Sequence, residues 1–287
     1  MKYAFIAANQ GKHPVETMCT VLGVSPSGFY DWRNRGVSGR LLKRQSLLEE
    51  IKKIYNKYRG RYGAPRIFKE LCAAGIACTK RTVEELMREN GIRAKRSKKF
   101  KATTDSNHNL PVAPNRLKRK FKRKKPNKCW VSDITYIHTE EGWLYLAVFI
   151  DLFSRKVVGW SMAQRMTADL VVNAFRMGIF RQHCAPRMVH SDRGSQYASQ
   201  LFRDELKLHG CLQSMSKKGD CWDNAVAESF FGALKCELVH DERFNSREAA
   251  KLAVFDYIET FYNRERRHSH LGYVSPEEFE NGMDTAG

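Results

Sequence analysis

Three acidic residues stand where they could bind divalent metal ions. Asp133 lies within residues 130–137, a run rich in β-branched and aromatic side chains that predicts a β-strand. Asp192 follows a short apolar run, where a strand is expected to give way to a loop, and Glu228 falls in the second turn of a helix expected over 223–235. Carboxylates suit Mg²⁺, and two such ions can clamp the attacking and leaving oxygens of a phosphodiester.

Spacing makes this set more specific than any one member, because a lone acid is most often a surface or helix-capping carboxylate. Between Asp192 and Glu228 lie 35 residues, and Lys235 follows Glu228 by seven, about two helical turns. Lys235 therefore shares a face with Glu228 and could hold a DNA end, or it is an ordinary surface lysine. His190 shares a strand face with Asp192 and either supports it or is a packed core histidine. For Asp223 we expect the role of helix N-cap rather than the alternative, a metal ligand.

Composition indicates a polyanionic partner. The 287 residues carry a net charge of +19 and the isoelectric point is about 9.7, which favours nucleic acid, with an anionic membrane surface as second choice. No apolar run approaches the ~20 residues of a spanning helix, and the N-terminus has no secretory core. We therefore expect a cytoplasmic protein with no membrane partner. The eight cysteines lack the paired spacing of a zinc finger.

The chain before the acids reads as helical. Residues 1–38 contain two short helical patterns separated by a glycine, with Ser25 as a cap, which fits a helix-turn-helix and a plain helical hairpin equally well. Residues 39–94 contain three helical patterns and are the better helix-turn-helix domain. Lys80 and Arg81 begin its last helix, so they are expected to approach a groove or phosphates of DNA. The alternative is a solvated charged face.

Residues 95–128 are expected to be a basic linker. They hold fourteen Lys or Arg residues against one acid, Asp105. Such a segment cannot bury enough apolar surface to fold alone, so we expect it to lie along the DNA backbone and to order on binding. The expected phosphate contacts are Lys118, Arg119, Lys120, Lys122, Arg123, Lys124 and Lys125.

Residues 129–264 read as the α/β domain that must position the acids. Its expected elements are strands near 129–138, 143–151 and 156–161, a helix at 168–182, a strand at 187–190, a helix at 199–209, a strand near 212–215 and a last helix over 246–264. Three antiparallel strands followed by helix–strand alternation is the order of the ribonuclease-H-like fold. The continuously apolar second strand is expected to be central. Residues 265–287 are expected to be a C-terminal tail.

These motifs together resemble the DDE transposases of the insertion-sequence-3 family, whose orfB-type product carries a retroviral-integrase-like catalytic core. The resemblance rests on WVSDITY at 130–136, HSDRGSQY at 190–197, DNA at 223–225 leading to ESFF at 228–231, Lys235, and HSHLGY at 268–273 with Ser-Pro at 275–276. It implies an α/β fold class, a ribonuclease-H-like integrase core preceded by an all-α helix-turn-helix region.

By that resemblance Asp133, Asp192 and Glu228 are catalytic and bind two Mg²⁺ (or Mn²⁺) ions. The implied activity is metal-dependent cleavage at the 3′ ends of an insertion sequence, followed by strand transfer in transposition and integration. The implied partner is double-stranded DNA, both the element's terminal inverted repeats and the target, bound by a homo-oligomer. An upstream-frame product, as a separate partner or as a frameshift fusion, is also implied.

Two other functions compete with this one. A hydrolysis-only ribonuclease-H-like nuclease needs the acids but neither the helix-turn-helix nor the basic linker. A catalytically decayed DNA-binding regulator does not need the acids, and all three are present. A metal-dependent strand-transfer assay separates the three functions by its outcome: transfer, hydrolysis only, or neither.

Overall fold

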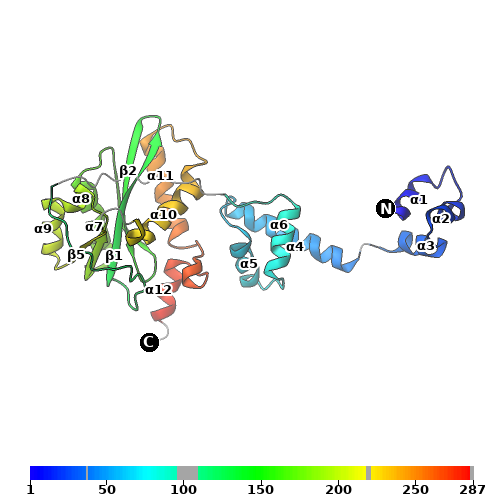
Figure 1. Ribbon diagram of the computed structural model, residues 1–287, viewed down its shortest axis with the longest axis horizontal. Coiled ribbons are helices and arrows are strands. Elements are labelled where there is room, and N and C mark those ends of the chain that lie inside the picture. Colours follow the sequence, from blue (N-terminus) through cyan, green and yellow to red (C-terminus); the bar gives the residue numbers. More distant parts are fainter. Residues whose placement is uncertain (37, 96–108, 218–220, 285–287) are drawn as a thin grey trace. The chain divides into compact units, whose positions relative to one another are not determined.

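The chain is described by a computed structural model over residues 1–36, 38–95, 109–217 and 221–284. It divides into two compact units, Met1–Ala94 and Lys95–Gly287 (Figure 1). Part of the expected linker (96–108) and part of the loop before Glu228 (218–220) lie outside the described residues. No helix in the described ranges is both long and apolar enough to cross a membrane.

The first helical cluster of the N-terminal unit is built from α1 (Lys2–Asn9), α2 (Val15–Leu22) and α3 (Pro26–Asn34). Its core consists of Ile6, Met18, Cys19 and Phe29. The left-handed backbone of the glycine after α2 ends that helix, and Ser25 caps α3 by accepting a hydrogen bond from the third residue along. Two helices joined by this short turn match the expected pattern, which fits a helix-turn-helix and a hairpin alike.

The second helical cluster contains α4 (Gly39–Lys57), α5 (Ala64–Ala73) and α6 (Lys80–Glu89). Each helix buries one apolar stripe, represented by Ile51, Ile67 and Val83, which are fully buried. The Thr79 hydroxyl accepts from the backbone of Thr82 and so fixes the start of α6.

The C-terminal unit contains a mixed five-stranded sheet within the described residues, in the order β3-β2-β1-β4-β5. The strands are β1 (Cys129–Thr139), β2 (Gly142–Asp151), β3 (Val157–Ala163), β4 (Met188–Ser191) and β5 (Leu212–Met215). β1, β2 and β3 are antiparallel, whereas β4 and β5 run parallel to β1. The apolar β2 lies inside the sheet, as its sequence predicts.

Helices cover both faces of this sheet (Figure 1). On one face α7 (Ala168–Gln182), α8 (Ser195–Ala198) and α9 (Gln200–Leu208) enclose a core that includes Trp130, Phe149 and Phe175. A Cβ at Gly159 on β3 would lie 2.2 Å from a backbone oxygen of α7, so only glycine allows this close approach. On the other face lie α10 (Ala225–Leu234) and α11 (Arg247–Phe255).

Residues 109–128, the described part of the expected linker, are anchored to this unit. Leu117 is fully buried, and its backbone N–H, like that of Arg116, donates to Ser214 Oγ on β5. This differs from the expectation of a segment that orders only on DNA. One buried apolar side chain and a few hydrogen bonds are enough to order the segment without DNA. The reason is that it lies against an edge strand and does not have to fold alone.

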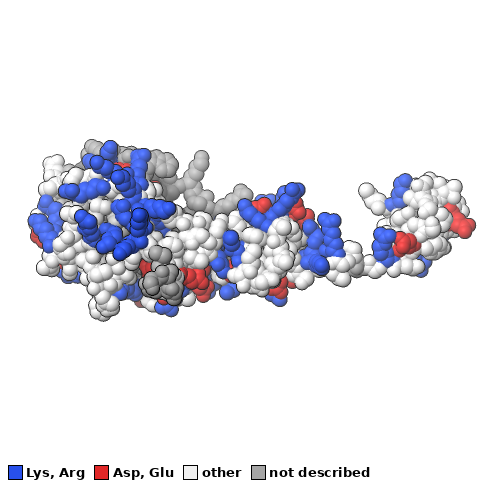
Figure 2. All heavy atoms as spheres, turned by 90° about the horizontal axis from the view of Figure 1, so that it is seen from below, with Lys and Arg blue, Asp and Glu red and all other residues white. Residues whose placement is uncertain are grey.

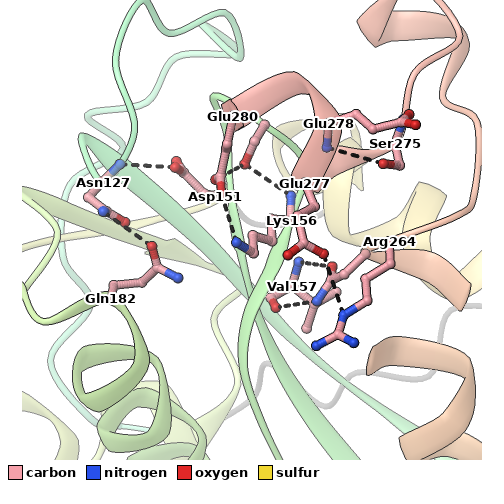
Figure 3. Close-up of polar contacts among 12 residues, drawn as sticks. Asn127, Asp151, Lys156, Val157, Gln182, Arg264, Ser275, Glu277, Glu278 and Glu280 are labelled. Atoms are coloured by element: carbon pink, nitrogen blue, oxygen red, sulfur yellow. Dashed lines mark hydrogen bonds and ion pairs between the residues drawn. The ribbon is translucent and has the colours of Figure 1, made fainter. Parts of the chain in front are cut away.

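The expected tail contains a docked helix, α12 (Pro276–Asp284). Its Glu280 accepts from Ser154 at 2.7 Å and pairs with Lys156 at 2.8 Å. Figure 3 shows this carboxylate reaching toward the β2–β3 connection. Phe279 packs on Phe153 nearby, with ring centroids 5.1 Å apart. α12 therefore packs on the core, because it supplies both an aromatic ring and a half-buried charge partner.

Candidate active site

The parallel pairing of β1 with β4 brings two of the acids together. Val131 pairs with His190 in this register, so continuing it by two residues places Asp133 beside Asp192. Asp192 comes directly after β4, and its Oδ1 accepts from the backbone N–H of Gly194 at 2.9 Å. A Cβ at Gly194 would lie 3.2 Å from the same oxygen. The small residue thus lets the loop close tightly around the carboxylate.

Glu228 approaches the pair from α10, which packs against β1. The helix follows a short 3₁₀ turn, Cys221–Asn224. Within that turn, the side-chain amide of Asn224 donates to the backbone carbonyl of Ser132 at 3.1 Å. Glu228 itself is exposed, yet partial shielding from water raises the pKa of its carboxyl.

Electrostatics connect the three acids. Burial, and then the neighbouring charge of Asp192, raise the pKa of Asp133 well above its ordinary value, and Glu228 adds to the shift. Lys235 acts in the opposite direction. Repulsion between close carboxylates is what a divalent cation relieves, so the donor set fits Mg²⁺. In the described residues, however, no three His, Cys, Asp or Glu side chains are gathered closely enough to hold a metal ion.

Lys235 follows α10 directly and begins a π-helix, Lys235–Val239. Its side chain is buried and its ammonium lies 5.0 Å from the ring centroid of Tyr136 on β1, a cation–π distance. Burial lowers the pKa of this lysine, while Asp133 raises it. The sequence places Lys235 on the face of Glu228 by α-helical spacing, but the helix changes to π-type at this residue. π-helical turns of this kind are frequent at functional sites.

Comparison with known proteins identifies the family. Residues 123–221 and 228–283 match family models described as integrase core domain, and residues 43–100 match an HTH-like domain. The chain is 47% identical over 285 residues to "Transposase InsF for insertion sequence IS3A" of Escherichia coli (strain K12), covering 98% of this chain and 99% of that protein.

The chain belongs to the IS3 family of transposases. The "Insertion element IS600 uncharacterized 31 kDa protein" of Shigella sonnei is also similar, 44% identical over 263 residues, with 91% of this chain and 97% of that protein covered. The integrase-core matches and the mixed sheet confirm the predicted α/β, ribonuclease-H-like fold.

Solved structures of retroviral integrases show a more distant likeness. One is the simian T-cell lymphotropic virus intasome in complex with PP2A regulatory subunit B56 gamma, with 17% identity, a TM-score of 0.47, and coverage of 80% of this chain and 74% of that chain. Another is the HTLV-2 integrase catalytic core domain in complex with magnesium, with 19% identity, a TM-score of 0.42, and coverage of 54% and 97%.

His190 of this transposase is a packed core histidine. It is fully buried, and its two ring nitrogens lie 2.8 Å from Ser214 Oγ and 3.3 Å from Ser216 Oγ. Burial lowers its pKa to about 4, against a smaller opposing effect of Asp223. The ring is therefore neutral near pH 7 and ties β4 to β5 immediately before Asp192.

The expectation that Asp223 caps α10 is wrong. The N-cap position is occupied by Asn224, with no side-chain cap bond. The Asp223 carboxylate instead accepts from Asn115, Arg119 and the backbone of Lys217. Local spacing suggests a cap, but the carboxylate is engaged by two donors that are distant in the sequence, Asn115 and Arg119, and by the backbone of Lys217.

The expected DNA contacts are accessible for the most part. Lysine and arginine side chains gather on one face of the C-terminal unit (Figure 2). In the basic segment (residues 109–128), six of the expected phosphate contacts are exposed, namely Lys118, Arg119, Lys120, Lys122, Lys124 and Lys125, whereas Arg123 is partly buried. On α6, Lys80 and Arg81 are exposed but pair with Glu84 and Glu85 of the same helix. Phosphates would have to compete with these surface pairs, which are weak.

Sequence reasoning missed the residues that support the site. Asn115 is a short polar side chain in a loop, where no local pattern marks it, and Asn224 lies within the motif at 223–225 but the sequence gives it no role of its own. Glu237 is another: it is buried, accepts from Arg266 at 2.8 Å and from the Tyr257 hydroxyl at 2.8 Å, and so anchors the π-helix that carries Lys235. For Glu237 the sequence offered one signal, a charged residue at an otherwise apolar helical position. Such a residue indicates that a buried partner of opposite charge is present.

Proposed function

We propose that the transposase cuts DNA at the 3′ ends of its element and joins those ends to a new site, with Asp133, Asp192 and Glu228 as the catalytic acids. The observation that carries this proposal is the pairing of β1 with β4, which brings Asp133 and Asp192 side by side. Glu228 on α10 then supplies a third carboxylate, and its charge contributes to the raised pKa of Asp133.

The three carboxylates would hold two Mg²⁺ (or Mn²⁺) ions, which would activate the attacking water or DNA 3′-hydroxyl and stabilise the leaving 3′-oxygen. Neighbouring backbone and side-chain groups fix the geometry of the acids. Gly194 orients the Asp192 carboxylate through its N–H, and Asn224 fixes the start of the Glu228 helix. A protonated Lys235 would hold the DNA end beside the acids. Direct transesterification needs no covalent protein–DNA intermediate and so no nucleophilic Ser or Tyr.

Double-stranded DNA is the proposed partner. The helix-turn-helix region, with Lys80 and Arg81 at the start of α6, would recognise bases or contact phosphates in the terminal inverted repeats. The basic segment would contact phosphates without reading bases. A homo-oligomer would bring two ends and the target together, and an upstream-frame product would act as partner or fusion.

A strand-transfer assay tests the proposal. The purified chain is incubated with Mg²⁺ and a duplex ending in the inverted repeat that flanks its own reading frame. The expected result is nicking at the 3′ end followed by joined products. Hydrolysis without joining would favour a nuclease, and binding without cutting would favour a regulator; either result rejects strand transfer by this chain.

A further inference from the structure

The carboxylate of Asp223 joins two segments that are distant in the sequence. Asp223 is only 3% exposed. Its Oδ2 accepts from Asn115 Nδ2 at 2.7 Å and from the backbone N–H of Lys217 at 3.0 Å. Its Oδ1 accepts from Arg119 Nε at 3.2 Å. Both oxygens are therefore engaged, which suits a structural tie between the basic segment and the start of α10.

The same stretch of the basic segment is tied to the strand that precedes Asp192. The backbone N–H groups of Arg116 and Leu117 donate to Ser214 Oγ, and that hydroxyl lies 2.8 Å from His190 Nδ1. One short segment thus contacts the supports of two of the three acids.

The backbone of this stretch adopts a strained conformation, and the contacts of the stretch must stabilise that conformation. Lys118 and Arg119 have φ values of 48° and 59°, in the left-handed region that residues with a Cβ rarely adopt. The N–H of Lys118 donates to Asn115 Oδ1 at 2.9 Å. This turn leaves Arg119 about half exposed, so its guanidinium can reach a phosphate while Nε stays on Asp223. Strain of this kind clusters at ligand clamps and switches.

We propose that Asp223 is a positioning residue through which DNA bound along the basic segment sets the placement of Glu228. The proposal rests on the catalytic role of Glu228 given above. Phosphates that bind Arg119 and its neighbours would hold the segment on the core and keep Asn115 on Asp223. Asp223 precedes Asn224, which bonds the Asp133 strand, and α10 starts at the next residue. Metal binding by the acids would then be favoured when DNA is in place.

The test compares Asp223→Asn, Asn115→Ala and the double variant, with Lys207→Ala as a control. Lys207 is an exposed lysine of α9, outside the basic segment. One readout is the Mg²⁺ concentration for half-maximal cleavage. The other, which needs neither metal nor cleavage, is the protection of amides 223–234 from hydrogen exchange when mixed-sequence duplex DNA binds.

We expect Asp223→Asn and Asn115→Ala each to raise the required Mg²⁺ concentration about tenfold, the usual effect of losing an outer support of a metal ligand. The double variant should lose less than the sum of the two single losses, because both changes remove the Asn115–Asp223 bond, while Asn115→Ala also removes the bond that Lys118 donates to Asn115. DNA-induced protection of 223–234 should disappear in these variants and persist in Lys207→Ala.

Three outcomes would overturn the proposal. One is an unchanged Mg²⁺ requirement with only a lower melting temperature, which is a purely structural role. Another is additive effects of the two substitutions. The third is an equal drop in protection in Lys207→Ala. If wild type does not cut at all, the proposed function fails, and the exchange measurement still decides the coupling. If Asp223→Asn does not fold, Asn115→Ala on the segment itself decides it.

Discussion

The side-chain amide of Asn224 and the backbone carbonyl of Ser132 are joined by a hydrogen bond of 3.1 Å. Ser132 immediately precedes Asp133, and Asn224 lies four residues before Glu228. This contact therefore links the strand of one proposed catalytic acid to the helix of another. Asn224 is only 4% exposed. Loss of this hydrogen bond would therefore leave a buried polar group without a partner, which is energetically costly.

Replacing Asn224 with Ala should slow cleavage while DNA binding stays intact. The substitution frees the start of α10 from β1, so Glu228 samples other positions. We expect a reduction of about tenfold or more in the single-turnover rate, roughly 1.4 kcal/mol in the barrier. A matched control is Asn90→Ala, at the end of α6 in the other unit. Equal rates for Asn224→Ala and wild type would show that the hydrogen bond does not position Glu228.

Lys235→Ala should raise the DNA concentration needed for cleavage and blur the choice of end. A protonated lysine cannot ligate Mg²⁺, so the Mg²⁺ titration should not move. Lys235→Arg should be milder because charge is kept, although the guanidinium fits the Tyr136 ring differently. Lys251→Ala, a lysine on the surface of α11, serves as control. A shifted Mg²⁺ titration with sharp end choice would mean that Lys235 acts through the metal site.

Neutralising the seven basic residues between Lys118 and Lys125 should weaken binding to all DNA sequences alike. Basic side chains that neutralise phosphates release counterions from DNA. The slope of log affinity against log salt should therefore flatten by roughly 0.9 for each phosphate that the variant no longer neutralises. Fluorescence titrations over a salt series measure this slope. If the slope stays at the wild-type value, the segment is solvated and does not touch the backbone of DNA.

Asp151 predicts a specific pH dependence of stability. This carboxyl is fully buried, and burial raises its pKa from 3.8 to about 6. It does so although the backbone N–H groups of Asn127 (Figure 3) and Phe153 donate hydrogen bonds to the carboxylate. The native state therefore holds the proton more tightly than the unfolded state. Protonated Asp151 therefore adds about 3 kcal/mol to the free energy of unfolding below about pH 4. This contribution is lost as the pH rises toward 6.

Asp151→Asn should remove that decline. Urea unfolding at several pH values between 4 and 7 gives the free energy of unfolding as a function of pH. The slope of this plot is then compared between wild type and variant. Asp256→Asn, an exposed aspartate, should keep the wild-type slope. Parallel curves for wild type and Asp151→Asn would mean that the buried carboxyl does not titrate in this range.

Much of the fold follows from local sequence pattern. The β-branched and aromatic run around Asp133 is β1, and the apolar run at 143–151 is the interior strand β2. Such runs depend only on neighbours in the chain, so they can be recognised without tertiary information. The helix 168–182 and the short strands before Asp192 and after α9 were predictable for the same reason.

The supports of the site were not predictable, because their partners are far apart in the sequence. Asn115 and Asp223 are 108 residues apart. The π-helix at Lys235 adds one residue to a turn, which changes no apolar pattern strongly enough to be seen. The tail helix α12 is short, and its role depends on where Glu280 meets Lys156 in the folded unit.

The central claim is that Asp133, Asp192 and Glu228 carry the chemistry. The most direct measurement is 3′-end cleavage and joining by Asp133→Asn, Asp192→Asn and Glu228→Gln, with DNA affinity measured in parallel and Asp204→Asn as an exposed control. We predict that each of the three variants loses cleavage and joining while binding DNA like wild type. Activity within about tenfold of wild type, a loss of only ~1.4 kcal/mol, would contradict the assignment of that residue.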